Sequence, residues 1–203
     1  MAGGAQSSDP KRRATVFGAL TGRPGVAVTP KAGGRPDLKG MLLAAYGLNR
    51  RGGLNTATAA KDLGVTQRTV QRWVASAGHQ RIAAPKPDTL SALMKKARQA
   101  ATTQRGRKAA LAAVRASKQG KALANHGGHI RIRGHQGPSA AGKTYKRDRE
   151  IRLELSPSEV EAMWSAYEQG GDKAFSSWIT DHADIQYVAG WEFERIDEMH
   201  LGR

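Results

Sequence analysis

TATAAKDLGVTQRTVQRWV, residues 56–74, is the stretch on which the interpretation of the whole chain depends. Its pattern predicts two short helices, 56–63 and 67–74, with Gly64 at the turn between them. A glycine adopts a left-handed backbone conformation there at little cost, and Thr66 is of a residue type that caps helix N-termini. Two short helices joined in this way are typical of a helix-turn-helix, whose second helix enters the major groove of DNA.

The second of these helices separates apolar from polar side chains at helical spacing. Val70, Trp73 and Val74 fall on one face and are expected to pack inward. The opposite face carries Gln and Arg, which pair with adenine N6/N7 and guanine O6/N7 respectively. The residues expected to contact DNA from this segment are Thr66, Gln67, Arg68, Thr69, Gln71 and Arg72. The alternative is an ordinary helical hairpin with a solvated polar face.

Charge is divided unevenly along the 203 residues, whose formal net charge is +16. Residues 1–150 hold 29 Lys/Arg against 6 Asp/Glu, a net +23, whereas residues 151–203 hold 4 against 11, a net −7. This asymmetry predicts a part that binds a polyanion joined to an acidic module. The absence of cysteine excludes disulfides and thiolate metal sites. Because no apolar run is long enough to span a bilayer, we expect a cytoplasmic protein with no membrane partner.

Shifts in composition predict four segments. Residues 1–36 are rich in Gly, Pro, Ser and Arg, and are predicted to be a mostly disordered basic arm. Residues 37–84 are predicted to be a helix-turn-helix DNA-binding domain, with a supporting helix that Asp37 caps. Residues 85–126 are predicted to be a basic helical segment, and residues 127–203 an α+β module. The expected fold class is therefore mainly α with a small β component.

The basic middle segment is expected to contain helices 89–102 and 107–125, the second broken by Gly120. Its lysines and arginines either clamp the DNA backbone, which adds affinity without sequence reading, or are simply solvated. A loop at 49–53 offers two further arginines. The residues expected to contact phosphates are Arg50, Arg51, Lys95, Lys96, Arg98, Arg107 and Lys108.

The C-terminal module begins with alternating apolar and charged residues at 127–134 and 151–155, which predict two strands. Ser156-Pro-Ser-Glu159 is a capping box that starts a helix. Two glycines at 170–171 are expected to end that helix before another begins at residue 172. Residues 185–201 are expected to form one or two further strands.

The order strand, helix, turn, helix over 151–183 resembles a ribbon-helix-helix unit. In that family the strand pairs with a twofold mate and forms an obligate dimer. The resemblance therefore implies a possible homodimer through 151–203, and the acidic character of the module favours dimerisation or partner binding over a second DNA reader.

Residues 137–144, GPSAAGKT, match the P-loop pattern GxxxxGK[ST], in which Lys143 and Thr144 would serve the outer phosphate and Mg²⁺. A strand precedes the match, but another strand follows where a P-loop opens a helix, and too few residues remain for a nucleotide-binding sheet. The alternatives are a basic flexible loop, or an exposed hydroxyl-bearing loop whose cations stabilise an incoming phosphate and a developing alkoxide.

His126, His129 and His135 lie within ten residues of one another. Neither an acidic ligand nor a further histidine lies nearby at a recurring spacing, which favours loop or DNA-contacting histidines over a metal site. No Ser/His/Asp set or close carboxylate pair is apparent either. We therefore predict no metal site and no enzyme.

Several blocks along the chain occur together in one known family. They are LTGRP (20–24), TPK (29–31), AAKDLGVTQRTVQRW (59–73), KARQAATT (96–103), GGHIRI (127–132) and RLELSP (152–157), followed by an acidic aromatic tail. In this order and spacing the chain, from about Ala19 onward, resembles the telomere terminal proteins of linear Streptomyces chromosomes and plasmids.

The resemblance implies a protein that binds telomere DNA, caps the ends of a linear replicon and primes DNA synthesis. One hydroxyl residue stays covalently joined to the DNA 5′ end, while a partner DNA polymerase supplies the catalysis. The resemblance also implies a telomere-associated partner protein and a location in the bacterial nucleoid at the replicon ends. No cofactor is expected to bind tightly, because Mg²⁺ and dNTP enter only through the polymerase.

The linked residue in this family is a threonine in the loop ahead of the RLELSP-like strand. That position corresponds most closely to Thr144, with Ser139, Thr102 and Thr103 as rivals. The alternative function is a plasmid- or phage-encoded helix-turn-helix regulator that performs no covalent chemistry.

Overall fold

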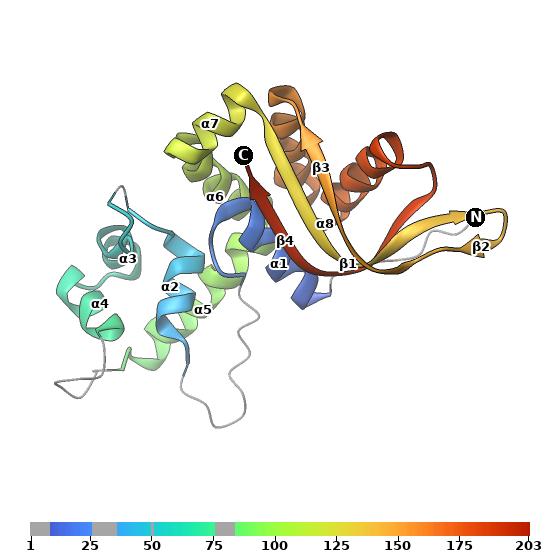
Figure 1. The fold of residues 1–203 in the computed structure, drawn as a ribbon. Coiled ribbons are helices and arrows are strands. Elements are labelled where there is room, and N and C mark those ends of the chain that lie inside the picture. Colours follow the sequence, from blue (N-terminus) through green and yellow to red (C-terminus); the bar gives the residue numbers. More distant parts are fainter. Residues whose placement is uncertain (1–8, 26–35, 50, 76–83) are drawn as a thin grey trace.

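The structure, a computed structural model, describes residues 9–25, 36–49, 51–75 and 84–203 (Figure 1). Within these ranges the chain is mainly helical with a small antiparallel sheet, which confirms the predicted class at that level. Its elements are α1 (Pro10–Thr21), α2 (Leu38–Tyr46), α3 (Thr56–Leu63), α4 (Gln67–Val74), α5 (Pro87–Thr102), α6 (Gln104–Ala116), α7 (Lys118–His126), β1 (Gly128–Ala140), β2 (Lys143–Thr144), β3 (Arg147–Leu155), α8 (Pro157–Gln186) and β4 (Trp191–Gly202).

Buried side chains form two separate clusters. The smaller cluster joins α2, α3, α4 and the first part of α5, and we call this part the helical body. The larger cluster joins α1, the end of α5, α6, α7, α8 and the sheet, and we call this part the sheet body. Helix α5 belongs to both, because Leu93 and Ala97 pack in the first cluster and Ala100 and Ala101 in the second. The segment predicted at 85–126 is thus shared between the two bodies.

The helix bounds predicted from capping residues in the helical body are confirmed. The Asp37 carboxylate accepts from the Gly40 N–H at 2.8 Å and starts α2. Helix α3 ends at Gly64, whose φ of 66° and ψ of 31° are left-handed. The Thr66 hydroxyl then accepts from the Thr69 N–H at 3.2 Å and starts α4. Each of these bounds rests on a local bond, which explains why sequence alone located it.

Helix α1 corrects the prediction of a mostly disordered arm for residues 10–21. Asp9 caps the helix, and its first position is Pro10, a residue suited to that place. Val16, Phe17 and Leu20 are almost fully buried in the core of the sheet body. This apolar stripe is short, so the helix depends on packing against β4 and α6 rather than on its own periodicity. Residues 1–8 and 26–35 of the predicted arm lie outside the described ranges.

Strand β1 is the centre of the sheet, with β3 on one side and β4 on the other, all antiparallel. The predicted alternation is confirmed: Ile130 and Ile132 on β1 and Leu153 on β3 face the core. The sequence placed the end of the first strand at residue 134, but β1 continues to Ala140. The extension is supported by the buried Gln136 side chain, which donates to the backbone oxygens of Ile132 and Arg149.

Helix α8 consists of two helical halves that meet at Gly171, which confirms the break predicted at the two glycines. It starts at the predicted capping box of Ser156 and Glu159. The backbone leaves the helical conformation at Gly171, with φ of 63° and ψ of −145°, and then resumes it. Its last turn includes Ile185, so the final strand starts later than predicted, at Trp191.

The outer edge of β3 is occupied by side chains of the same chain. The Tyr187 hydroxyl lies 3.0 Å from both the backbone nitrogen and the backbone oxygen of Arg152. The Gln186 amide likewise bonds to the backbone nitrogen and oxygen of Glu154, at 2.9 and 2.7 Å. A ribbon-helix-helix strand offers this edge to a twofold mate, whereas here Arg152 and Glu154 already bond to side chains of their own chain. The homodimer through 151–203 stays a prediction.

Candidate nucleic-acid interface and acceptor hairpin

Helix α4 presents one polar face to solvent. Arg68, Gln71 and Arg72 are exposed, whereas Val70 and Trp73 are buried against the rest of the helical body. No ion pair holds Arg68 or Arg72 among the described residues. Two uncompensated guanidiniums and an amide therefore face outward from one short helix, as a base-reading surface requires.

Small and apolar residues hold α4 in place. Ala59 and Ala60 of α3 are buried, which lets the two helices approach closely. Behind α3, the Asp62 carboxylate accepts from the Tyr46 hydroxyl at 2.7 Å and forms an ion pair with Lys96 of α5. These bonds connect α2, α3 and α5, and they stabilise the helices against which α4 packs.

Three of the predicted α4 contacts already have partners within the chain. The Gln67 side-chain amide donates to the Thr56 hydroxyl at 2.9 Å, although Gln67 is exposed. The Thr66 and Thr69 hydroxyls lie 2.8 Å apart, and Thr66 also caps the helix. These three residues position α4, which leaves Arg68, Gln71 and Arg72 as the candidate DNA contacts whose side chains face outward without a partner in the described ranges.

Some of the predicted phosphate-contacting residues are exposed, and others are held in ion pairs or hydrogen bonds within the chain. Arg51, Lys95, Arg98 and Lys108 are exposed. Lys96 is half-buried in its ion pair with Asp62, and Arg50 lies outside the described residues. Lys118 and Lys121 of the predicted basic segment are also exposed without an ion pair in the described part of the chain. Lys61 and Arg105, which the sequence prediction did not include, are exposed in the same way. The exposed and the ion-paired cations differ only in their solvent exposure. The sequence could not separate them, because the apolar periodicity of such cation-rich helices is weak.

Arg107 is a correction, because it is buried in the sheet body and does not face solvent. Its guanidinium donates to the backbone oxygens of Glu168 and Gln169 at 3.2 and 3.1 Å, and to that of Thr102 at 3.2 Å. The same group lies 5.8 Å from the ring centre of Tyr167. Arg107 therefore fills a structural position in α6 and is unsuited to contact DNA phosphates.

The P-loop match at 137–144 forms a β-hairpin. Ala140 pairs with Lys143 and Ser139 with Thr144, leaving Ala141 and Gly142 as the two-residue turn. Both turn residues have positive φ, 50° and 76°, as a type I′ hairpin turn requires. A phosphate-binding P-loop leads from a strand into a helix, whereas this segment leads from one strand into another, so the P-loop interpretation is wrong.

Thr144 lies near the tip of this hairpin and is exposed. No described residue forms a hydrogen bond with its hydroxyl. Lys143, Tyr145 and Arg147 close to it are exposed as well, and neither cation has an ion pair in the described part of the chain. Lys146 instead pairs with Glu192 of β4 at 2.6 Å, which ties the hairpin to the sheet.

The rival hydroxyls are already used by the fold. Thr102 donates to the Arg98 oxygen at 2.9 Å, and Thr103 donates to the Gln99 oxygen at 2.8 Å. Thr103 also caps α6 through the Gly106 N–H. Ser139 is half-buried, and its side chain is a hydrogen-bond partner of the Glu192 carboxylate. Of the four candidates, Thr144 alone is both exposed and without a hydrogen bond to its hydroxyl among the described residues.

Helix α4 and the hairpin lie at opposite ends of the molecule (Figure 1). Helix α4 belongs to the helical body, and β2 lies at the far end of the sheet. The described residues contain no group of three or more His, Cys, Asp or Glu side chains placed to hold a metal ion. Among the described helices, none is both long enough and apolar enough to cross a membrane.

Comparisons of the chain with protein-family models, with curated proteins and with solved structures gave no significant match.

Proposed function

We propose that this chain is a DNA-binding terminal protein that caps the ends of a linear replicon and primes DNA synthesis from a threonine hydroxyl. The helical body acts as a helix-turn-helix in which Arg68, Gln71 and Arg72 of α4 read telomere DNA. Thr144 accepts the first nucleotide, and a partner DNA polymerase with its Mg²⁺ and dNTP supplies the catalysis. The chain itself is then a primer and not an enzyme.

The observation that carries this proposal is the unengaged Thr144 hydroxyl on a short basic hairpin, remote from α4. In the priming step the Thr144 Oγ attacks the α-phosphorus of a dNTP. A phosphoester bond forms, the bond to the leaving pyrophosphate breaks, and the hydroxyl proton passes to a base of the polymerase. A serine or threonine that is to enter another protein's active site has to be exposed and free of bonds to its own chain.

The neighbouring charges suit the same step. Lys143 and Arg147 flank the acceptor, and both are exposed without an ion pair in the described ranges. Cations at this position attract a triphosphate and stabilise the charge that develops as the oxygen attacks. The remote α4 meanwhile binds duplex DNA without blocking the hairpin.

The direct test is to purify the protein from its natural host, digest the attached DNA with nuclease and search by mass spectrometry for the peptide containing Thr144. The expected result is a nucleotide mass on Thr144. A Thr144→Ser variant should still become linked, whereas Thr144→Val, of nearly the same shape, should not. Linkage at Ser139 in the unmodified protein would place the acceptor on the other strand of the hairpin, at the residue that pairs with Thr144.

A matched control is Thr102→Val, which removes a hydroxyl that is bonded within α5 and should leave linkage intact. A replicon with unblocked 5′ ends would contradict the proposed priming function. Retained binding to internal operators by the Thr144→Val variant, with no linked peptide, would instead identify a regulator.

A further inference from the structure

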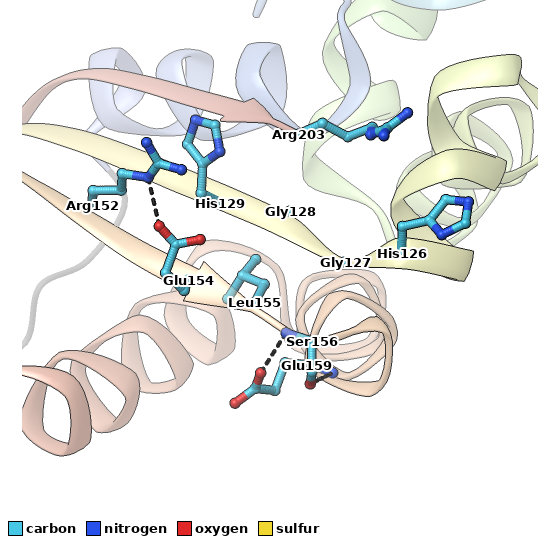
Figure 2. A pocket seen from close by; sticks show the side chains of 10 residues that line it. All are labelled: His126, Gly127, Gly128, His129, Arg152, Glu154, Leu155, Ser156, Glu159 and Arg203. Carbon is cyan, nitrogen blue, oxygen red and sulfur yellow. Dashed lines mark hydrogen bonds and ion pairs between the residues drawn. The ribbon is translucent and has the colours of Figure 1, made fainter.

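A shallow pocket of about 420 Å³ lies at the end of the sheet opposite the hairpin (Figure 2). It is formed where α7 ends, α8 begins and the last residue of the chain follows β4. Its charged lining includes His126, His129, Arg152 and Arg203, with Glu154 and Glu159 beside them. Its volume falls in the range of small-molecule sites, about 300–1,000 Å³.

Like charges are placed side by side next to this pocket. On β1, Arg131 lies directly opposite Arg152 of β3 on one side and His200 of β4 on the other. All three side chains are exposed on the face of the sheet that points away from the helices. Like charges directly opposite each other destabilise an antiparallel sheet unless an anion compensates them. Arg131 has no ion pair within the described ranges.

His129 brings an uncompensated polar group to the same place. Only 8% of its surface is exposed, and its Nδ1 atom is buried without a hydrogen-bond partner in the described part of the chain. The His129 and His200 rings each bring an Nε2 atom to 3.4 Å from the point that a Cβ on Gly202 would occupy. Burial, and then the charges of Arg152, Arg131 and His200, hold the pKa of His129 below its ordinary value, while Glu154 opposes them. The positive potential is thus felt inside the pocket.

The acidic residues of the pocket are occupied by other partners. Glu154 accepts from Arg152 Nε at 2.6 Å, which leaves the outer nitrogens of that guanidinium available. Glu159 accepts from the Ser156 N–H at 2.6 Å and lies 3.2 Å from His182. The reciprocal bonds of Ser156 and Glu159 cap the start of α8, so Glu159 is engaged in the fold. The side chains of the sheet remain as the binding groups.

We propose that this pocket binds a phosphate group, held by Arg152 and His129 with Arg131 and His200 at its margin. The phosphate belongs either to a nucleotide or to a DNA strand, and the chemistry of recognition is the same for both. A guanidinium offers paired donors that match phosphate geometry, and an imidazole adds a third donor. This site is separate from α4 and from Thr144, and it does not depend on the function proposed for either.

The test follows the histidine ring signals of the full-length protein by nuclear magnetic resonance. The probes are inorganic phosphate, deoxycytidine monophosphate, and a short single-stranded oligonucleotide with and without a 5′ phosphate. We expect the His129 signal to shift with saturation, and the pKa of His129 to rise on binding, because an adjacent anion favours the imidazolium. Tighter binding of the mononucleotide would identify a nucleotide site, and tighter binding of either oligonucleotide a DNA strand site.

Two substitutions with opposite expected effects on phosphate affinity distinguish a loss of binding from a loss of structure. Arg152→Gln should weaken phosphate binding by about tenfold, because it removes the paired donors. Glu154→Gln should strengthen it severalfold, because it removes a competing carboxylate from the same guanidinium. Arg195→Gln, a matched loss of an exposed ion-paired arginine elsewhere on the same sheet, should change nothing. If Arg152→Gln does not fold, phosphate binding by Glu154→Gln and by the unmodified protein still tests the proposal.

The proposal is overturned if inorganic phosphate leaves the His129 signal unmoved, or if Arg195→Gln weakens binding as much as Arg152→Gln does. Neither result would bear on nucleotide linkage at Thr144 or on DNA recognition by α4, which are measured separately.

Discussion

Arg107 and Gly171 meet at the kink of α8: the guanidinium Cζ lies 3.1 Å from the point that a Cβ on Gly171 would occupy. The backbone departs from the helix at Gly171, so the carbonyl oxygens just before it lose their intrahelical donors. Arg107 reaches across from α6 and donates to two of them, at Glu168 and Gln169. A single buried side chain therefore ends one half of α8 and secures α6 against it.

Arg107→Met should lower the free energy of unfolding by about 2–4 kcal/mol, since three carbonyl oxygens lose a charged donor inside the protein. Urea unfolding followed by circular dichroism measures this change. Lys108→Met is the matched control, because the neighbouring Lys108 is exposed, and it should change stability by less than about 0.5 kcal/mol. Equal losses in the two variants would contradict the structural role of Arg107.

Arg68→Ala and Arg72→Ala should each weaken specific DNA binding by about 1–3 kcal/mol without lowering stability, because both side chains are exposed on α4. Binding to a telomere duplex and to a scrambled duplex, measured by fluorescence anisotropy at fixed salt, gives the loss of specificity. Gln67→Ala serves as the comparison. Its amide is bonded to Thr56, so the change should also loosen the junction between α3 and α4. If both arginine variants still distinguish the telomere duplex from the scrambled duplex as well as the unmodified protein does, α4 does not recognise the DNA sequence.

Removing the groups that close the β3 edge should promote self-association. The paired change Gln186→Ala with Tyr187→Phe frees the backbone groups of Arg152 and Glu154. An unpaired strand edge is a template for another strand. We expect sedimentation to show concentration-dependent dimers or larger species, with a loss of about 1–2 kcal/mol in stability. The neighbouring Ile185→Ala, at a residue 80% exposed, is the control and should not promote association.

The stability of the hairpin turn should depend on how easily the residue at position 141 adopts a positive φ. Ala141 adopts a φ of 50°, which costs an alanine more than an asparagine. Ala141→Asn creates Asn-Gly at a type I′ turn and should stabilise the protein by about 0.5–1 kcal/mol in thermal unfolding. Ala141→Pro cannot reach a positive φ and should open the hairpin. If Thr144 depends on the hairpin for its presentation, the proline variant should lose nucleotide linkage although the hydroxyl remains.

Acidification should weaken the support of α3 through Asp62. Its ion pair with Lys96 and its bond from Tyr46 hold the pKa of Asp62 below its ordinary value. A carboxylate with a lowered folded-state pKa stabilises the fold above its unfolded value, and the contribution is lost as the pH falls through the folded value. The stability difference between the protein and Asp62→Asn should therefore be largest near about pH 7 and shrink toward about pH 3. Urea unfolding across that range measures it, and a difference that grew on acidification would contradict the ion pair.

The sequence was sufficient where a boundary depends on neighbouring residues. Gly64 and Thr66 locate the turn before α4, and Ser156 with Glu159 starts α8, because the bonds that cap a helix span three or four residues. The outward face of α4 followed in the same way from helical spacing. These features account for much of the candidate DNA-reading surface.

Features that depend on distant contacts were beyond the reach of the sequence. Nothing local distinguishes Arg107 from its exposed neighbour Lys108, since its acceptors lie 61 and 62 residues away. Helix α1 shows too short an apolar stripe to be recognised without the sheet on which it packs. The glycines at 137 and 142 imitate a P-loop, and only the pairing of Ser139 with Thr144 reveals a hairpin.

Helix α5 has Leu93 and Ala97 in one core and Ala100 and Ala101 in the other, without a break between them. A continuous helix advances about 1.5 Å and turns about 100° for each residue. If α4 binds the recognition sequence and Thr144 is the acceptor, as proposed, α5 fixes the distance between the bound DNA site and the acceptor oxygen. One residue added to α5 would rotate the helical body by about 100° relative to the sheet body, whereas four added residues would nearly restore the original orientation about 6 Å farther away. On this proposal the length of α5 would define how many base pairs separate the recognition sequence from the end of the DNA.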